Sequence, residues 1–218
     1  MKKVVKKQLK EDEFVSTINK IVRFIKEQRR ELIIVASILV VVIAGIFAIR
    51  YFRTQGLKKQ SQVVSEMLDL RAGLEKNPGN VAQLEKMGGD QKFARVAYLL
   101  LATYWIENGN LDKAEASLTK IKTRPKDLYY YQAQDLLARV CLQRKNYDKA
   151  IEIYKKIEKE KPREYSLDVV LFNRAEALEK KGDRAGAAAV FKKVQEEYPQ
   201  TYYGYDASLR AKKLEGEK

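Results

Sequence analysis

The chain has 218 residues, a formal net charge of +14, no histidine and a single cysteine, Cys141. These counts exclude histidine-based catalytic triads, histidine-ligated zinc and a disulfide within the chain. The sequence also has no phosphate-binding glycine-rich loop, so we expect no enzyme, no cofactor and no metal site. The positive net charge suggests nucleic acid as a partner, but the sequence contains no RRM, OB or helix-turn-helix motif. We expect lipid and protein partners instead.

Residues 1–31 form a basic segment with ten lysines or arginines and five acidic residues. Its apolar residues recur at helical spacing from Phe14 to Ile25, and Lys20, Arg23 and Lys26 fall on the opposite face. This pattern is typical of a cytoplasmic amphipathic helix that lies on a membrane surface. A plain helical extension with a solvated charged face would give the same pattern.

Residues 32–49 read LIIVASILVVVIAGIFAI and contain no charge and no proline. Eighteen helical residues extend over about 27 Å, close to the thickness of a bilayer's hydrocarbon core. The alternative is a buried helix of a soluble protein, but such helices are seldom apolar all round for this length. The flanking sequence does not fit a cleaved signal peptide, so we predict an uncleaved transmembrane helix.

The charges on either side of this helix predict its direction. Ten basic residues precede it, whereas Arg50, Arg53, Lys58 and Lys59 follow it closely. An excess of basic residues favours the cytoplasmic side, and long domains cross largely regardless of their charge. We therefore expect a single-pass membrane protein with its N-terminus in the cytoplasm and its C-terminal domain on the other side of the membrane.

Residues 50–93 are predicted to form a membrane-proximal helical hairpin. Val63, Met67, Leu70 and Leu74 lie on one face of the first helix. The turn signal at residues 77–80 ends that helix, and a short second helix is expected over residues 81–87.

Residues 94–199 contain three copies of one sequence repeat. Gly109-Asn110-Leu111-Asp112-Lys113-Ala114 aligns with segments that begin at Lys145 and Gly182, so the three equivalent alanines lie 36 and 37 residues apart. An alanine stands twelve residues before each, and a large apolar or aromatic residue stands four after it. The predicted repeat core is Ala102, Ala114, Leu118, Ala138, Ala150, Tyr154, Ala175, Ala187 and Phe191.

This spacing suits pairs of antiparallel helices, because small residues are needed where two helix backbones approach closely. A period near 34 residues with this pattern resembles the tetratricopeptide repeat. The predicted fold class is therefore all-α: an N-terminal amphipathic helix, a transmembrane helix and a short tetratricopeptide-like α-solenoid. Residues 200–218 would then form a capping helix and tail that cover the last apolar face.

The order of these segments resembles the bacterial family of membrane-anchored tetratricopeptide proteins that includes the ancillary subunit of the SecYEG translocon. The resemblance rests on Asp12-Glu13-Phe14, on residues 32–49 and on the repeat cores. It implies a protein of the bacterial inner membrane with its C-terminal domain in the periplasm. It also implies a protein–protein interaction adaptor whose partners are translocon subunits, a periplasmic chaperone or a nascent polypeptide, with no nucleic acid.

A second group is similar at the C-terminal end of the repeats. Periplasmic coordinators of cell-envelope constriction and outer-membrane assembly share an ending like Tyr198-Pro199-Gln200-Thr201-Tyr202. The alternative function is therefore an envelope assembly or division coordinator that self-associates through its repeat domain. Such proteins usually carry a cleaved signal or a lipid anchor, so this resemblance ranks second.

Repeat solenoids of this kind bind peptides on the concave surface formed by the first helix of each repeat. The alignment places nine residues on that side: Leu99, Thr103, Ile106, Asp135, Arg139, Leu142, Phe172, Glu176 and Glu179. This mixture of apolar and charged side chains suits an extended polypeptide. Apolar residues at helical spacing are more often core, so the alternative is that the apolar members pack against neighbouring helices. Cys141 is expected to be a small buried hydrophobe.

Overall fold

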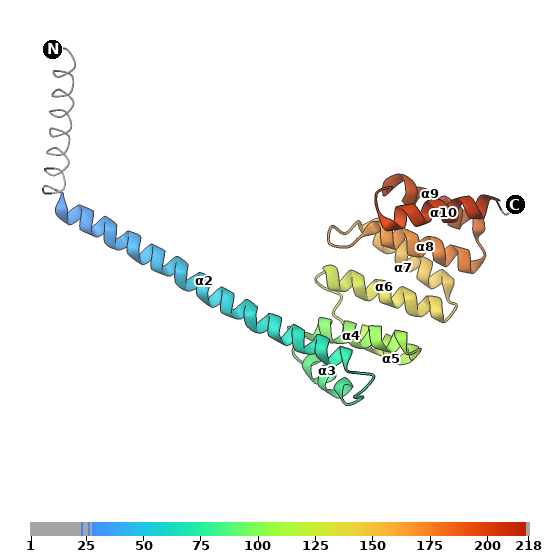
Figure 1. The fold of residues 1–218 in the computed structure, drawn as a ribbon, viewed down its shortest axis with the longest axis horizontal. Helices are drawn as coiled ribbons and strands as arrows, with labels where there is room; N and C mark the ends of the chain where they lie inside the picture. Colours follow the sequence, from blue (N-terminus) through green and yellow to red (C-terminus); the bar gives the residue numbers. More distant parts are fainter. Residues whose placement is uncertain (1–22, 24–25, 27, 217–218) are drawn as a thin grey trace, which may run out of the picture. The chain divides into compact units, whose positions relative to one another are not determined.

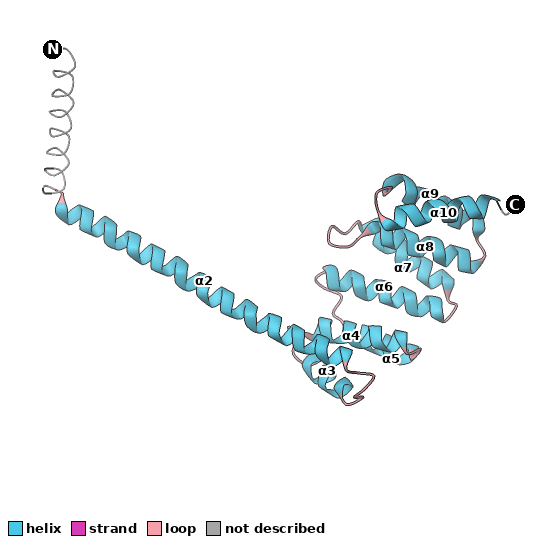
Figure 2. Ribbon diagram, in the orientation of Figure 1, coloured by secondary structure: helices cyan, strands magenta, loops and turns pink. Residues whose placement is uncertain are grey.

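The computed structural model describes residues 23, 26 and 28–216 of the chain, and all regular structure within them is helical (Figures 1 and 2). This confirms the all-α class. Most of the predicted amphipathic segment, residues 1–31, lies outside the described residues. The helices are α2 (Arg29–Ala72), α3 (Asn80–Gly88), α4 (Ala94–Glu107), α5 (Leu111–Thr119), α6 (Leu128–Gln143), α7 (Tyr147–Glu160), α8 (Leu167–Lys181), α9 (Arg184–Glu197) and α10 (Tyr202–Gly216).

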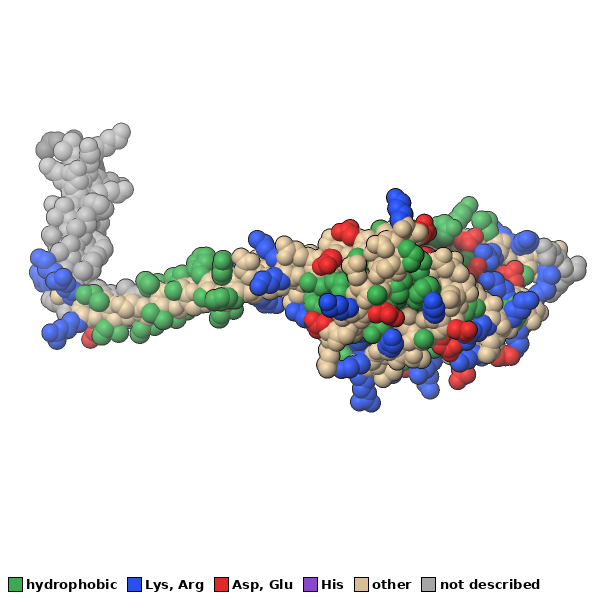
Figure 3. Space-filling model, turned by 90° about the horizontal axis from the view of Figure 1, so that it is seen from below, with side chains coloured by type: hydrophobic (Ala, Val, Ile, Leu, Met, Phe, Trp, Pro, Cys, Tyr) green, Lys and Arg blue, Asp and Glu red, His purple; other side chains and the backbone are tan. Residues whose placement is uncertain are grey.

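The chain divides into two compact units at residue 61, and each is described by itself. The first unit contains the apolar part of α2, where Val41, Phe47 and Ile49 are 70, 68 and 69 % exposed. Figure 3 shows hydrophobic side chains along this stretch, with basic side chains near both of its ends. Within the described residues, α2 is the one helix long and apolar enough to cross a membrane, judged by length and composition.

The helix does not end where the apolar stretch ends. The polar residues 50–61 continue it, with Gly56 inside the helix, and α2 stops only at Ala72. Residues 50–61 contain two arginines, two lysines and two glutamines, which are good helix formers, so the change from apolar to polar side chains does not interrupt the helix.

The second unit is a stack of helical hairpins. Its first core cluster joins Met67 and Leu74 near the end of α2 to Leu84 of α3 and to Ala97 and Leu101 of α4. Three hairpins follow, α4 with α5, α6 with α7 and α8 with α9, and α10 packs on α8 and α9. The nine residues of the repeat alignment are all buried: Ala102, Ala114, Leu118, Ala138, Ala150, Tyr154, Ala175, Ala187 and Phe191.

Each of the three hairpins turns in the same way. Gly109, Lys145 and Gly182 stand at equivalent positions and have positive φ values of 70°, 59° and 91°. The next residue in each turn is Asn110, Asn146 or Asp183, whose side chain accepts a hydrogen bond from a backbone N–H in the first turn of the second helix. This N-cap satisfies one of the free donors at the helix start. The segments aligned in the sequence are therefore the hairpin turns.

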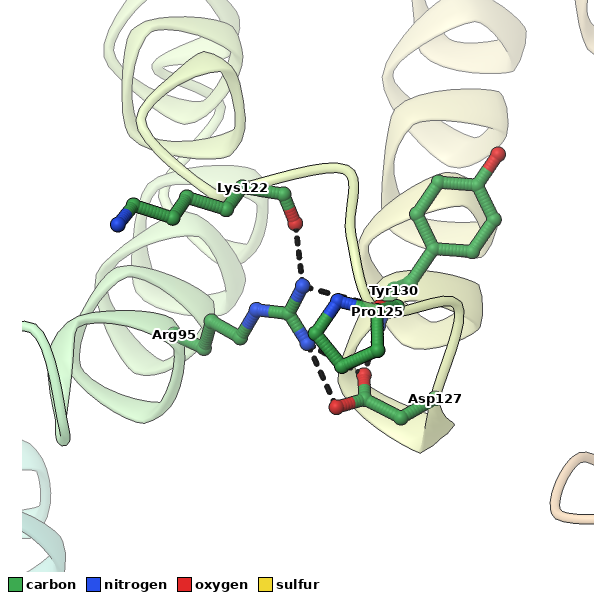
Figure 4. A network of polar contacts seen from close by, with 5 residues as sticks. All are labelled: Arg95, Lys122, Pro125, Asp127 and Tyr130. Carbon is green, nitrogen blue, oxygen red and sulfur yellow. Dashed lines mark hydrogen bonds and ion pairs between the residues drawn. The ribbon is translucent and has the colours of Figure 1, made fainter.

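The connection from α5 to α6 is held by Arg95 of α4 (Figure 4). The Arg95 guanidinium donates through Nη1 to both carboxylate oxygens of Asp127, at 2.6 Å each. Through Nη2 it also donates to the backbone carbonyls of Lys122 and Pro125, at 2.6 and 3.0 Å. Asp127 in turn caps α6 by accepting from the Tyr130 amide. One side chain of the first hairpin thus fixes the start of α6.

The last helix approaches the chain before it very closely at Gly204. A Cβ atom at that position would lie 1.9 Å from the carbonyl oxygen of Tyr198. Only glycine lets α10 begin so near the end of α9, and this approach places the neighbouring Tyr203 against Phe172 of α8, with ring centroids 5.1 Å apart.

Candidate functional site

A cavity of about 410 Å³ lies where α6, α8 and α10 meet over one residue of α7. It is lined by Asp135, Arg139, Leu142 and Gln143 of α6, by Val169, Asn173, Glu176 and Lys180 of α8, by Tyr154 of α7 and by Tyr203 of α10. The volume falls within the range of ordinary ligand sites.

Helical periodicity brings these side chains together. The α6 residues Asp135, Arg139 and Leu142 are spaced by four and three, so they share one face of that helix. The α8 residues Val169, Asn173, Glu176 and Lys180 are spaced by four, three and four and share one face in the same way. The first helices of the second and third hairpins therefore present two adjoining polar faces, and α10 adds Tyr203 as a third wall.

The floor of the cavity is polar and largely shielded from water. The Asn173 side-chain amide donates to Asp135 Oδ1 at 3.2 Å. Burial raises the pKa of the Asp135 carboxyl. The hydrogen bond from Asn173, the charge of Arg139 and the hydroxyls of Tyr154 and Tyr165 act on this pKa in the opposite direction. The net upward direction means that the protein solvates this carboxylate less well than water does.

Tyr154 forms the deepest part of the floor. Its side chain is fully buried, and its hydroxyl makes no hydrogen bond of ordinary geometry. Burial first, and then the charge of the neighbouring Asp135 carboxylate and a hydrogen bond to it, raise the pKa of Tyr154. Tyr165 is affected by the same two causes, and its ring stacks on that of Tyr131 with centroids 6.3 Å apart.

The rim of the cavity carries two basic side chains and one paired acid. Arg139 and Lys180 are exposed and form no ion pair with any other described residue. Glu176 instead pairs with Arg210 of α10, at 3.0 Å, and Arg210 also lies 3.4 Å from Glu179 and 5.2 Å from the Phe172 ring centroid. Arg139 and Lys180 are thus available to a ligand, whereas Glu176 already has an ion-pair partner.

Of the nine residues expected on the concave side, the cavity brings together Asp135, Arg139, Leu142 and Glu176. Three apolar members lie in the core instead: Leu99, Ile106 and Phe172 are 8, 3 and 5 % exposed. Thr103 is half-buried and its hydroxyl donates to the Leu99 carbonyl, and Glu179 pairs with Arg210. These three residues therefore pack against neighbouring helices, as the alternative interpretation expected, because each lies on the side of its helix that faces the hairpin partner.

The sequence reasoning did not place six lining residues in the site: Gln143, Tyr154, Val169, Asn173, Lys180 and Tyr203. Asn173 and Lys180 lie on the same helical face as Glu176, so that periodicity was a usable signal. Tyr154 was assigned to the core alone, although it belongs to both the core and the floor. Tyr203 gave no signal, because α10 lies outside the repeat alignment.

A second cavity, of about 450 Å³, adjoins Trp105 but is less suited to a ligand. The Lys113 ammonium already lies 4.4 Å from the centroid of the Trp105 ring, so the aromatic face is occupied. Reactive groups are also scarce. Cys141 is buried, as expected, and burial raises the pKa of its thiol, which disfavours the thiolate. Within the described residues no group of acidic, cysteine or histidine side chains could hold a metal ion.

Comparison with protein families agrees with this geometry. The family model described as a tetratricopeptide repeat-like domain matches residues 23–169, and that of the tetratricopeptide repeat matches residues 169–201. No curated protein is significantly similar to the chain. Repeat domains of this kind are typically non-catalytic modules for protein–protein interaction. Since the first match covers more than half of the sequence, the chain belongs to the tetratricopeptide repeat-like domain family.

Proposed function

We propose that this protein is a membrane-anchored adaptor that binds a partner polypeptide in the cavity between α6, α8 and α10. The observation that carries the proposal is the cavity itself: two helical faces of polar and apolar side chains with unpaired cations at the rim. Among the described residues, no group of acidic, cysteine or histidine side chains could hold a metal ion.

Anchoring would be provided by α2. Its apolar residues are exposed, and burying such side chains away from water is favourable. The excess of basic residues before residue 32 supports a cytoplasmic N-terminus. The resemblance to membrane-anchored tetratricopeptide proteins supports a bacterial inner membrane and a periplasmic repeat domain. An anchor confines the cavity to the membrane surface, which raises its effective concentration near partners held there.

The partner class we propose is the protein-translocation or chaperone machinery: translocon subunits, a periplasmic chaperone or the nascent polypeptide. This part rests on the resemblance to the family that includes the ancillary translocon subunit. The mixed lining supports an extended chain rather than one strongly charged motif, because it includes Leu142 and Val169 as well as charged groups.

A self-associating coordinator of envelope assembly is the second candidate, and one observation favours it. Tyr202, Tyr205 and Leu209 form a stripe on α10 and are 76, 66 and 50 % exposed. An exposed aromatic stripe on the last helix of a solenoid could stack on a second copy.

Site-specific crosslinking in intact cells tests the proposal. A photoreactive phenylalanine at position 142 lies in the cavity, and the same probe at Lys155 on the exposed face of α7 is the matched control. We expect adducts with a different protein from position 142 and none from position 155. Adducts between two copies of the chain from position 202, with none from position 142, would favour the self-associating coordinator.

Topology is tested separately. A reporter fused after Lys218 should be active only if the C-terminus is outside the cytoplasm. If a second reporter, active only in the cytoplasm, were active after the same fusion, the proposed orientation would be wrong. The binding proposal would then still be tested by the crosslinking experiment.

A further inference from the structure

Four basic side chains follow the apolar stretch of α2 without an acidic neighbour in the sequence. Residues 50–65 contain no aspartate or glutamate and four cations: Arg50, Arg53, Lys58 and Lys59. Basic residues close to a transmembrane helix are found mainly on its cytoplasmic side. The proposed orientation puts this cluster on the opposite side, where topology disfavours it, so the cluster needs another explanation.

The side chains at this end of the apolar stretch are exposed and unpaired. None of the four cations forms an ion pair with another described residue, and all four are exposed. Between the two arginines, the Tyr51 and Phe52 side chains are 62 and 73 % exposed. Exposed aromatic rings are enriched where the hydrocarbon core of a bilayer meets its headgroups. This end of the helix therefore has the composition of a membrane interface with added positive charge.

The rise of the helix separates the four cations into two pairs. A bilayer of about 40–45 Å has a hydrocarbon core of about 30 Å, so each headgroup layer is roughly 5–8 Å thick. At about 1.5 Å per residue, Arg50 and Arg53 lie about 2 and 6 Å beyond Ile49 along the helix axis. Lys58 and Lys59 lie about 14 and 15 Å beyond it. The backbone positions of the arginines are thus at headgroup depth, whereas those of the lysines are past it.

The two arginines also share one face of α2. Side chains three residues apart on a helix are neighbours, with Cβ atoms about 5–6 Å apart. The planar guanidinium has several donors in a fixed arrangement that matches the oxygens of a phosphate group. A zwitterionic headgroup brings its own ammonium to its phosphate, whereas an anionic headgroup brings a net negative charge. Two cations without an acidic partner therefore favour the anionic headgroup.

We propose that Arg50 and Arg53 bind the phosphates of anionic phospholipids in the leaflet that surrounds this end of α2. Tyr51 and Phe52 pack beside the same lipids at the boundary of the hydrocarbon core. Lys58 and Lys59 add only a weaker attraction over a longer distance, which dissolved salt screens. The inference rests on the membrane anchoring in the proposed function, and it specifies which lipid the anchor selects.

The experiment measures which lipids lie next to this end of α2 in the full-length protein. Phe47→Trp places a fluorescent probe at an exposed position of the apolar stretch, three residues before Arg50. The protein is reconstituted into vesicles of four parts phosphatidylcholine to one part phosphatidylglycerol. Bromine atoms, which quench nearby tryptophan, are carried on the acyl chains of the phosphatidylglycerol or of an equal amount of the phosphatidylcholine. The parent protein, in which Trp105 is the sole tryptophan, gives the background to subtract.

We expect phosphatidylglycerol to occupy the sites beside the probe about 3- to 10-fold more often than phosphatidylcholine does. The preference should fall in 1 M salt, where charges are screened within about 3 Å. Arg50→Gln with Arg53→Gln should lose most of the preference. Lys58→Gln with Lys59→Gln is the matched control, because it removes the same charge beyond the headgroup layer, and it should keep most of the preference. All four substituted side chains are exposed, so both double variants should fold normally.

Equal quenching by the two brominated lipids would overturn the inference. A preference that survives in the arginine variant would also overturn it, as would a loss in the lysine variant at least as large as that in the arginine variant. If neither lipid quenches the probe at position 47, the stretch does not lie in the bilayer, and the proposed anchoring fails together with the inference. Equal quenching by both lipids leaves the anchoring intact, so the two failures are distinguishable.

Discussion

The Tyr131 hydroxyl of α6 donates to Glu160 Oε2 at the end of α7, at 3.0 Å. Burial first and this hydrogen bond second raise the pKa of Tyr131 to about 12. Glu160 also accepts from the Lys126 ammonium at 2.6 Å, and the pKa of its carboxyl is lowered, with the Lys126 hydrogen bond as the largest cause. The ionised Glu160 carboxylate thus links the start of α6 to the end of α7, at the end of the hairpin opposite its turn.

The contribution of Glu160 to stability should therefore depend on pH. A lowered folded-state pKa means that the ionised form stabilises the fold, fully above the ordinary value of 4.5, and that this stability is lost as pH falls through the folded pKa. We expect the difference in unfolding free energy between the wild type and Glu160→Gln to be constant from pH 6 to 8 and to shrink below about pH 4.5. Urea denaturation in detergent, followed by circular dichroism, measures it. A difference that grows toward acid pH would contradict the prediction.

Asp135 should show the opposite sign. Its pKa is raised, so the folded protein binds this proton more tightly than the unfolded chain does. Stability is then lost as pH rises from the ordinary value of 3.8 through the folded pKa. Compared with the wild type, Asp135→Asn should therefore gain relative stability as pH rises from the ordinary value of 3.8 through the folded-state pKa, and hold that gain at higher pH. The same denaturation series tests this, and parallel profiles for Asp135→Asn and Glu160→Gln would refute it.

Arg95→Ala should loosen the start of α6. The variant loses charge-assisted hydrogen bonds to Asp127 and to two backbone carbonyls, and Arg95 is only 14 % exposed. We expect a loss of roughly 2 kcal/mol in unfolding free energy. Trp105, the sole tryptophan, lies on the same helix, so its fluorescence during urea denaturation is a suitable probe.

The control for Arg95 is Arg144→Ala. Arg144 also contacts two acids, Asp112 and Glu115, but it lies on the surface of the second hairpin turn with 36 % of its side chain exposed. Its loss should cost less than the loss of Arg95, because ion pairs on the surface contribute little to stability. Equal costs for the two variants would mean that the Arg95 contacts do not organise the α5–α6 connection.

Lys145→Gly should stabilise the protein. Lys145 has a φ of 59° at the position where the other two hairpins have glycine, and a side chain is strained in that region. We expect a gain of about 0.5–1 kcal/mol in unfolding free energy. Lys155→Gly is the matched control, because it places glycine in the middle of α7 and should cost about 0.5–1 kcal/mol. A loss of stability in both variants would contradict the prediction.

The repeat domain could be predicted well because its constraints are local in sequence. Ala114, Ala150 and Ala187 mark places where backbones approach, and small residues at such places leave a periodic trace. The length of α2 could not be predicted in the same way. The sequence changes from apolar to polar after Ile49, but helix propensity does not change there. Whether a helix continues depends on that propensity and not on the polarity of its side chains.

The site was only partly predictable. Asp135 and Glu176 were assigned to the concave side by alignment, and they line the cavity. Leu99 and Phe172 were assigned by the same alignment, but the first helices of these hairpins carry apolar residues on more than one face. The alignment shows which helix a residue belongs to. Whether that residue faces the groove or the core depends on the neighbouring helices. That information is tertiary, as is the contribution of Tyr203 from α10.

The stacked arrangement has a consequence for the synthesis of the chain. In the repeat domain, helices pack on the next helix or the next but one, so each hairpin can close shortly after it emerges from the ribosome. The cavity is different, since its wall at Tyr203 belongs to α10, the last helix described. The repeats can therefore be folded while the cavity is still open on one side. The binding site is completed only when residues 202–216 have been made and have docked.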